Sequence, residues 1–294
     1  MAGHGAITGG YYLLAKLGMH LLAEFAPNAF FDFDHVEVTD GLIRMGRLPR
    51  SRFFVWIDPK GKRDVVLFIG EAQPPTGKYA FCHQLIEYAK SLGVERVFTF
   101  AAMATQMHPG HDSRVFGAAT DLESLADLKR LELPLLEDGH IGGLNGVFLG
   151  VAVESGIRGT CLLGEMPHIF AQLPFPKASL SVLKVFTMIA EIEIDFSELT
   201  QQARAMDQEL GKLLAGIERG IEETTLAEEE EFPTDVSKDT GLSPDDETRI
   251  EELFGQARED RSKAYELKRE LDRLNAFADY ENRFLDLFKK PDEK

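Results

Sequence analysis

Three carboxylates lie beside predicted strands or core helices, where a general base could reach a substrate. Glu71 follows the apolar run Val65–Ile69, Glu165 follows the run Thr160–Leu163, and Glu154 lies on a predicted helix of small residues. A carboxylate whose pKa is tuned by its surroundings can transfer a proton in catalysis. The same residues can equally cap a helix or pair with an arginine, so both interpretations stay open. The sequence has no Gly-x-Ser-x-Gly or His-Glu-x-x-His pattern, and no catalytic set is predicted.

The segment MHPGHDSR holds a weak candidate for a metal site. His108, His111 and Asp112 are potential ligands, and the Pro-Gly turn between the histidines brings the two imidazoles together. A metal site needs three or four ligands, and this loop supplies no complete set. Exposed loop histidines are the simpler interpretation, so we expect neither a metal nor a cofactor.

The N-terminal segment GHGAITGG includes Gly3, His4 and Gly5 and leads into a predicted helix. Backbone N–H groups at such a helix start can bind an anion. The segment is not a dinucleotide fingerprint, because no strand precedes it, and it lacks the Lys-Ser/Thr pair of a phosphate loop. Tight packing of the helix on a sheet is the alternative interpretation.

The stretch Gly164–Ala178, GEMPHIFAQLPFPKA, runs directly from a buried strand into a helix. Its prolines and its two fixed ends predict a shaped loop at one end of a sheet. In open α/β sheets, ligands usually bind at that end. The candidate ligand-binding residues come from this loop and from segments expected near it: Gly3, His4, Gly5, Glu71, Met103, Asn145, Glu165 and His168.

Composition excludes several classes of protein. The 294 residues are 44% hydrophobic and include 21 Phe, enough for a large core. No apolar run predicts a membrane span, and no signal peptide is evident. The formal net charge of −17 argues against nucleic acid and anionic membrane as partners. Cys82 and Cys161 lie in apolar patterns, which indicates buried free thiols and a cytoplasmic protein.

Apolar runs alternate with helical patterns along residues 1–221. Strands are predicted at Met19–Phe25, His35–Val38, Leu42–Met45, Arg52–Ile57, Val65–Ile69, Arg96–Ala101, Val115–Ala119 and Thr160–Leu163. Helices are predicted at Ile7–Leu17, Tyr79–Ser91, Leu122–Arg130, Gly146–Glu154, Ser179–Ala190 and Phe196–Ile217. This alternation predicts a three-layer α/β domain with a mostly parallel sheet.

An acidic segment separates this domain from a C-terminal helical tail. Glu222–Glu247 contains eleven acidic residues and one basic residue, so residues 222–242 are predicted to be a solvated linker. Residues 243–294 begin with a Ser-Pro helix start and carry a seven-residue apolar pattern, which Asp260 and Glu281 interrupt. We expect two shorter helices, which pack either on their own domain or on another subunit or partner protein.

Several motifs resemble the proteasome-assembly-chaperone-type family, of the chaperone 2 type. They occur in order between Gly3 and Ile217 and are EFAPNAFFDF, RFFVWIDP, FIGEAQPP, GVERVFTFAAM, GAATD, GLNGVFLGVAVESGI and GEMPHIFAQLPFPKA. The resemblance implies a phosphorylase/hydrolase-like fold and self-association, with trimers plausible. In archaeal and eukaryotic relatives it implies help with proteasome ring assembly without catalysis. The acidic linker and helical tail look like those of bacterial members.

The chain departs from the family pattern at both ends. Members usually begin with an apolar strand before the Gly-rich segment. Either a strand precedes residue 1, which we expect, or this member lacks a core strand and has an exposed sheet edge. Chaperone relatives also end in a hydrophobic–Tyr–any-residue motif that docks on proteasome rings. Pro291–Lys294 does not carry that motif.

Two functions are therefore hypotheses. The first is a non-catalytic oligomer that acts in protein assembly or scaffolding. The second is a small-molecule-binding protein or enzyme of the phosphorylase/hydrolase type, with its pocket at the carboxyl end of the sheet. A cavity that joins two carboxylates would favour the second function. Filled space and exposed apolar surface would favour the first.

Overall fold

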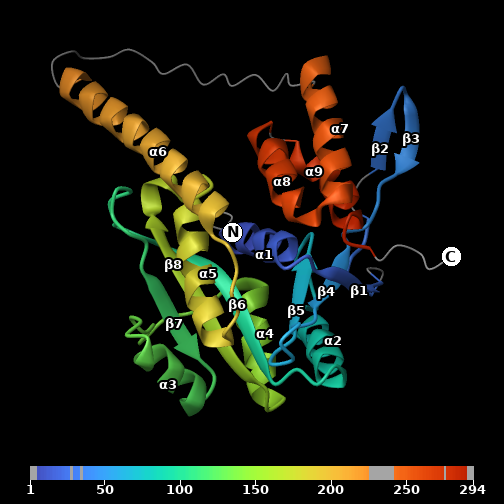
Figure 1. The fold of residues 1–294 in the computed structure, drawn as a ribbon, viewed down its shortest axis with the longest axis vertical. Coiled ribbons are helices and arrows are strands. Elements are labelled where there is room, and N and C mark those ends of the chain that lie inside the picture. Colours follow the sequence, from blue (N-terminus) through green and yellow to red (C-terminus); the bar gives the residue numbers. More distant parts are fainter. Residues whose placement is uncertain (1–4, 27–28, 34–35, 225–241, 275, 290–294) are drawn as a thin grey trace.

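The computed structural model describes residues 5–26, 29–33, 36–224, 242–274 and 276–289, and its fold is mixed α/β (Figure 1). The strands are β1 (His20–Phe25), β2 (Val36–Thr39), β3 (Leu42–Met45), β4 (Ser51–Trp56), β5 (Val65–Gly70), β6 (Arg96–Thr105), β7 (Val115–Ala119) and β8 (Arg158–Pro167). The helices are α1 (Gly5–Lys16), α2 (Lys78–Ser91), α3 (Leu122–Arg130), α4 (Gly143–Glu154), η3 (His168–Phe170), α5 (Pro176–Ala190), α6 (Ser197–Thr224), α7 (Pro244–Glu259), η4 (Arg261–Lys263), α8 (Ala264–Arg273) and α9 (Phe277–Asp286).

The strands form two three-stranded sheets and a separate hairpin. One sheet has the order β1-β4-β5, the other has the order β6-β8-β7, and β2 pairs with β3. The prediction of a mostly parallel sheet is wrong, because among the described residues only the β6–β8 ladder is parallel. Residues 57–64 connect β4 to β5, and residues 106–114 connect β6 to β7. Both connections are shorter than the dozen or so residues that a parallel crossover needs, so the next strand runs back.

Helices cover both faces of the β6-β8-β7 sheet. On one face, the rings of Phe98 and Phe100 in β6 pack edge-on against Phe186 of α5. On the other face, Cys161 of β8 lies in a hydrophobic cluster with Cys82 of α2 and residues of α4. Burial on both faces explains why β6 and β8 are apolar along most of their length. Both cysteines are buried and free, as predicted.

Two glycines occupy positions that a larger residue would disrupt. Gly18 follows α1 with a φ of 57°, the left-handed conformation predicted for the residue after a helix. A Cβ atom on Gly164 would lie 2.6 Å from the carbonyl oxygen of Ala178. Only glycine therefore lets the end of β8 pass so close to the first turn of α5. This close approach fixes the loop that links β8 to α5.

The C-terminal helices pack on α1 of their own chain. Phe254 of α7 and Phe284 of α9 belong to the same hydrophobic cluster as Tyr11 and Tyr12 of α1. The backbone N–H of Leu21 in β1 also donates to the carbonyl oxygen at position 288, at 2.7 Å. The first of the two packing arrangements left open by the sequence is therefore present. Figure 1 shows these helices, in red, beside α1.

The described part of the tail, residues 243–274 and 276–289, contains three α-helices rather than the two predicted. Ser243 caps the start of α7, where its hydroxyl accepts from the Asp246 N–H at 3.1 Å. Asp260 ends α7, as predicted, and its carboxylate caps η4. Glu281 does not interrupt a helix, because it lies inside α9 with its carboxylate turned toward α1, where Tyr11 donates a hydrogen bond to it.

Several predictions lie outside the described residues or cross their limits. α6 extends to Thr224, beyond the domain boundary predicted at residue 221. Gly3, His4, Pro291–Lys294 and most of the predicted linker, residues 225–241, are not described, and a strand before residue 1 stays a prediction. Within the described part of the chain, no helix combines the length and apolar character needed to cross a bilayer.

Candidate functional site

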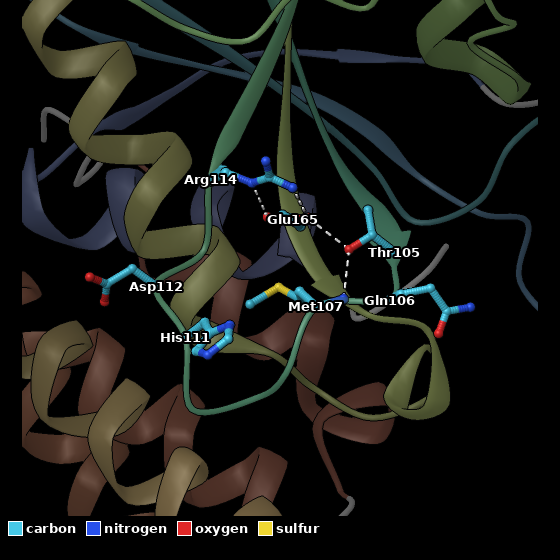
Figure 2. A pocket seen from close by; sticks show the side chains of 7 residues that line it. All are labelled: Thr105, Gln106, Met107, His111, Asp112, Arg114 and Glu165. Atoms are coloured by element: carbon cyan, nitrogen blue, oxygen red, sulfur yellow. Dashed lines mark hydrogen bonds and ion pairs between the residues drawn. The ribbon is translucent and has the colours of Figure 1, made fainter.

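A cavity of about 490 Å³ lies at the carboxyl ends of β6 and β8, beside the start of β7 (Figure 2). The parallel β6–β8 ladder brings these two strand ends together, and the antiparallel β7 begins next to them. The residues that line the cavity are Thr105, Gln106, Met107, His111, Asp112, Arg114 and Glu165. The cavity therefore lies at the sheet end where the sequence predicts a site.

Glu165 is the buried centre of this site, with only 2% of its side chain exposed. Arg114 donates to its carboxylate from Nε and Nη2, both at 2.7 Å, and the Thr105 hydroxyl donates at 2.7 Å. The Arg114 guanidinium holds the pKa of Glu165 below its usual range. Glu165 is consequently an anion at neutral pH, and its low pKa makes it a weak proton acceptor.

Lys177 shapes the loop that forms one wall of the cavity. It lies in the first turn of α5, directly after Pro176, and its ammonium donates to the carbonyl oxygens of Pro109 at 2.8 Å and His111 at 3.0 Å. The Pro-Lys-Ala end of the loop Gly164–Ala178 thus pins a second loop across the sheet end. The same ammonium forms an ion pair with the Asp207 carboxylate of α6 at 2.5 Å, so Lys177 holds the second loop and α6 against the start of α5.

His108 and His111 lie close together but do not form a metal centre with Asp112. Their ring centroids are 5.4 Å apart, and Nδ1 of His108 accepts from the Gly110 N–H at 3.1 Å. All three side chains are exposed, and only His111 and Asp112 line the cavity. Among the residues that the structure describes, no group of three or more His, Cys, Asp or Glu is arranged to hold a metal ion.

The other predicted ligand-binding residues lie elsewhere. Gly5 begins α1, and His168 is exposed on η3. Met103 is the register partner of Glu165 but packs against the Cys82 cluster. Asn145 of α4 donates from Nδ2 to the carbonyl oxygen at position 100 in β6, at 2.7 Å, which satisfies a backbone group. Glu154, on the same helix, accepts from the Tyr79 hydroxyl at the surface.

Glu71 belongs to a second polar site, which we call the arginine cluster and define as Glu24, Arg47, Arg50, Arg52 and Glu71. Glu71 accepts from Arg47 Nη1 at 2.6 Å and from the backbone N–H of Arg50 at 2.8 Å. Arg52 is 1% exposed and pairs with Glu24 at 3.3 Å and with Glu71 at 3.5 Å. Buried charges need such partners, and the two glutamates of the cluster pair with its three arginines.

The tail closes over the arginine cluster. Asn282 of α9 accepts from Arg52 Nη2 at 2.8 Å. Beside it, the Tyr11 hydroxyl donates to Glu281. Burial raises the pKa of Tyr11, which keeps its hydroxyl protonated as a donor, and burial also raises the pKa of Glu281. Arg52 of the cluster thus links β4 to α9, and Tyr11 links α1 to the same helix.

Four residues that line the cavity were not predicted from the sequence: Thr105, Gln106, Met107 and Arg114. Two of them, Thr105 and Arg114, donate to Glu165. The sequence does carry one signal for Arg114, because this residue directly precedes the predicted strand Val115–Ala119. Thr105 was missed because the predicted strand ends at Ala101, whereas β6 continues through Ala102–Ala104 to Thr105. The sequence does not predict that these two side chains meet Glu165, since that contact depends on the order of the strands in the sheet.

Comparisons with known proteins place the chain among relatives. A sequence model of the PAC2 family matches residues 2–214. An uncharacterized protein of Methanocaldococcus jannaschii is 30% identical over 164 residues, which are 55% of this chain and 62% of that protein. The matched part thus spans less than two thirds of that relative's length.

Solved structures resemble the same part of the chain. A proteasome-assembly chaperone homologue from Mycobacterium tuberculosis aligns with a TM-score of 0.62 and 25% identity, over 72% of this chain and 89% of that one. A PAC2 family protein from Streptomyces avermitilis aligns with a TM-score of 0.62 and 25% identity, over 72% of this chain and 90% of that one. An archaeal proteasome activator from Pyrococcus furiosus aligns with a TM-score of 0.60 and 23% identity, over 72% of this chain and 89% of that one. At this identity the likeness concerns the fold alone.

Proposed function

Because the chain belongs to the PAC2 family, we propose that it is a non-catalytic protein that self-associates and acts in protein assembly or scaffolding. The similar structure from Mycobacterium tuberculosis, a proteasome-assembly chaperone homologue, supports this class of function. Two finer features are part of the same proposal. One is a three-layer phosphorylase/hydrolase-like arrangement, and the other is a trimeric assembly. A cytoplasmic location also belongs to it, since buried free cysteines are typical of reducing compartments.

One observation carries the proposal: the two buried carboxylates that could act as bases are neutralised in separate places. Glu165 is held by Arg114 in the cavity, whereas Glu71 is held by Arg47 and Arg52 in the arginine cluster. Acid–base catalysis needs groups that share a site and have a pKa near the working pH. Carboxylates fixed in ion pairs instead hold loops and helices in place, as an assembly protein needs.

The test uses the full chain, purified with a removable tag from its native lysate. Light scattering gives the number of subunits, and quantitative mass spectrometry of captured proteins gives the partners. We expect more than one subunit and at least one partner in a fixed ratio, both retained in a Glu165→Gln variant that still folds. A monomer without any partner in a fixed ratio would contradict the proposal.

The cavity beside Arg114 favours a second candidate function, the binding of a small anion. The Arg114 guanidinium is largely exposed although it pairs with Glu165, and His111 lines the same space. A guanidinium recognises carboxylate and phosphate groups. Thermal unfolding with inorganic phosphate and with small dicarboxylates tests this function, because a ligand at 100 times its Kd stabilises the fold by about 2.7 kcal/mol. No shift, or an equal shift in an Arg114→Gln variant, would contradict it.

A further inference from the structure

The hairpin of β2 and β3 projects away from both sheets (Figure 1). Every residue of the two strands is exposed. Val36 pairs with Met45 and Val38 pairs with Ile43 across the antiparallel ladder. Directly opposed residues lie on the same face of a hairpin, and alternate residues along a strand also share a face. One face of the hairpin is therefore entirely apolar.

This apolar face consists of Val36, Val38, Ile43 and Met45, which are 47%, 66%, 74% and 61% exposed. The opposite face carries three polar residues, Glu37, Thr39 and Arg44, and one apolar residue, Leu42. A hairpin with one polar and one apolar face is built to be covered on the apolar one. An isolated two-stranded hairpin is also only marginally stable in water. Contact with another surface would supply the missing burial.

Charge indicates what covers this face. The chain has a formal net charge of −17, and residues 36–45 contribute −1 of it, from Glu37, Asp40 and Arg44. None of these charges belongs to the apolar face. A basic partner would bind the acidic parts of the chain instead. A second copy, which is equally acidic, meets least repulsion where the surface carries no charge, as on the apolar face of the hairpin.

The projection of the hairpin also reduces the repulsion between two copies. Repulsion between acidic bodies decays over a Debye length of about 8 Å at physiological salt. Two copies that meet through projecting hairpins keep their bodies apart while they bury apolar side chains. The face is also suited to meet itself, because a rotation axis, two-fold in a dimer or three-fold in a trimer, brings the same four apolar residues of each copy together.

We propose that the apolar face of the β2–β3 hairpin is a self-association surface, on which the same face of a second copy packs. This inference rests on the proposed self-association and names the surface responsible for it. The patch is roughly a few hundred Å² per copy, smaller than the roughly 800 Å² that each partner buries in a standard interface. The contact is therefore reversible and depends on protein concentration.

Light scattering over a range of protein concentrations tests the surface with two matched variants. Ile43→Glu places a charge on the apolar face, and Thr39→Glu places the same charge on the polar face of the same hairpin. We expect Ile43→Glu to weaken self-association roughly tenfold or more, because the contact would bury an unpaired carboxylate. Thr39→Glu should match the wild type. Both positions are exposed, and far-UV circular dichroism confirms that each variant folds.

Chemical cross-linking distinguishes face-to-face packing from other contacts. Val38→Cys and Thr39→Cys place a thiol on the two opposite faces, while Cys82 and Cys161 stay buried in both variants. A short bismaleimide should link two Val38→Cys chains much faster than two Thr39→Cys chains. Equal linking, or an Ile43→Glu variant that associates like the wild type, would overturn the inference alone. A monomeric wild type would overturn it together with the proposed self-association.

Discussion

At the scale of the residue, Glu165 shows how one contact decides the role of a carboxylate. Its position after a buried strand suits a general base, and burial alone would raise its pKa toward that role. Arg114 reverses the outcome, because two charge-assisted hydrogen bonds hold the carboxylate as an anion. The residue then fixes β7 against β8 at the cavity instead of transferring a proton.

Removal of the arginine should reveal this role in stability. We expect Arg114→Gln to lower the free energy of unfolding by about 1–3 kcal/mol at neutral pH, because a buried carboxylate loses charged partners. The native pKa of Glu165 lies below the ordinary 4.5. The stabilisation is therefore present above pH 4.5 and is lost as the pH falls through the native pKa. Urea unfolding at several pH values should show the two proteins converge in acid.

The matched control is Arg130→Gln, which removes an arginine from an exposed pair with Asp127 on α3. Exposed pairs of this kind contribute about 0–1 kcal/mol, so this variant should unfold almost like the wild type. If Arg130→Gln lowered the free energy of unfolding as much as Arg114→Gln does, the buried position of Glu165 would not explain the loss of stability.

Glu281 gives a prediction of the opposite sign. Burial raises its native pKa above the ordinary 4.5, although Tyr11 donates to it and Arg47 and Arg52 lie near. The ionised form is then disfavoured in the native state, so wild-type stability falls as the pH rises through the native pKa. Glu281→Gln removes this cost and keeps an oxygen that accepts from Tyr11. We expect the variant to be more stable than the wild type at pH 8 and equal to it below pH 4.

A second tail carboxylate provides the control for this prediction. Glu251 pairs with Arg283 at the surface, and the Arg283 hydrogen bond lowers its pKa. Glu251→Gln should therefore leave stability unchanged or slightly reduced at pH 8. Chemical unfolding of both variants across this pH range settles the comparison. If Glu281→Gln were less stable than the wild type at pH 8, the nearby arginines would stabilise the ionised Glu281 carboxylate more than burial destabilises it.

At the scale of the element, local pattern predicted most helices and strands, but not how they pair. The apolar runs that predict β4, β5 and β7 are compatible with either strand direction. The short connection between the predicted strands Arg52–Ile57 and Val65–Ile69 was visible in the sequence and argues for antiparallel neighbours. The second short connection, residues 106–114, was hidden because the predicted strand ended at Ala101. The order β6-β8-β7, by contrast, depends on contacts between distant segments, and the cavity exists only because of it. Sequence reasoning therefore located Glu165 but not its partners.

The same limit explains the different outcomes at Asp260 and Glu281. Both are acidic residues in an apolar seven-residue pattern, so pattern alone treats them alike. Asp260 ends α7 because its side chain caps the next turn. Glu281 stays within α9 because Tyr11, far away in the sequence, supplies a donor on the buried side. A buried polar residue can be interpreted only when its partner is known.

The tail and α1 share one hydrophobic core and should therefore unfold together. Leu271 of α8 is fully buried in that core, whereas Leu122 of α3 is 84% exposed. We expect Leu271→Ala to lower the free energy of unfolding by about 2–5 kcal/mol and Leu122→Ala by less than about 0.5 kcal/mol. Calorimetry should show a single transition in both proteins. Two transitions, of which Leu271→Ala shifts only one, would show that the tail is a separate unit.

At the scale of the whole molecule, charge and apolar surface are kept apart. The segment Glu222–Glu247 carries a net charge of −10, from eleven acidic residues and one basic residue, out of the −17 of the whole chain. The apolar face of the β2–β3 hairpin carries no charge. An acidic chain resists non-specific association, so contact between copies is restricted to surfaces where the repulsion is small. The proposed hairpin contact meets that condition.

Salt should therefore strengthen self-association. Added salt screens the repulsion between two acidic chains and leaves the burial of Val38 and Ile43 almost unaffected. Sedimentation velocity at one protein concentration, from about 0.02 M to about 0.5 M sodium chloride, should show a rising fraction of associated protein. The Ile43→Glu variant should stay dissociated throughout. If salt instead dissociated the wild type, contacts between opposite charges would hold the copies together, and the apolar hairpin would not be the surface that joins them.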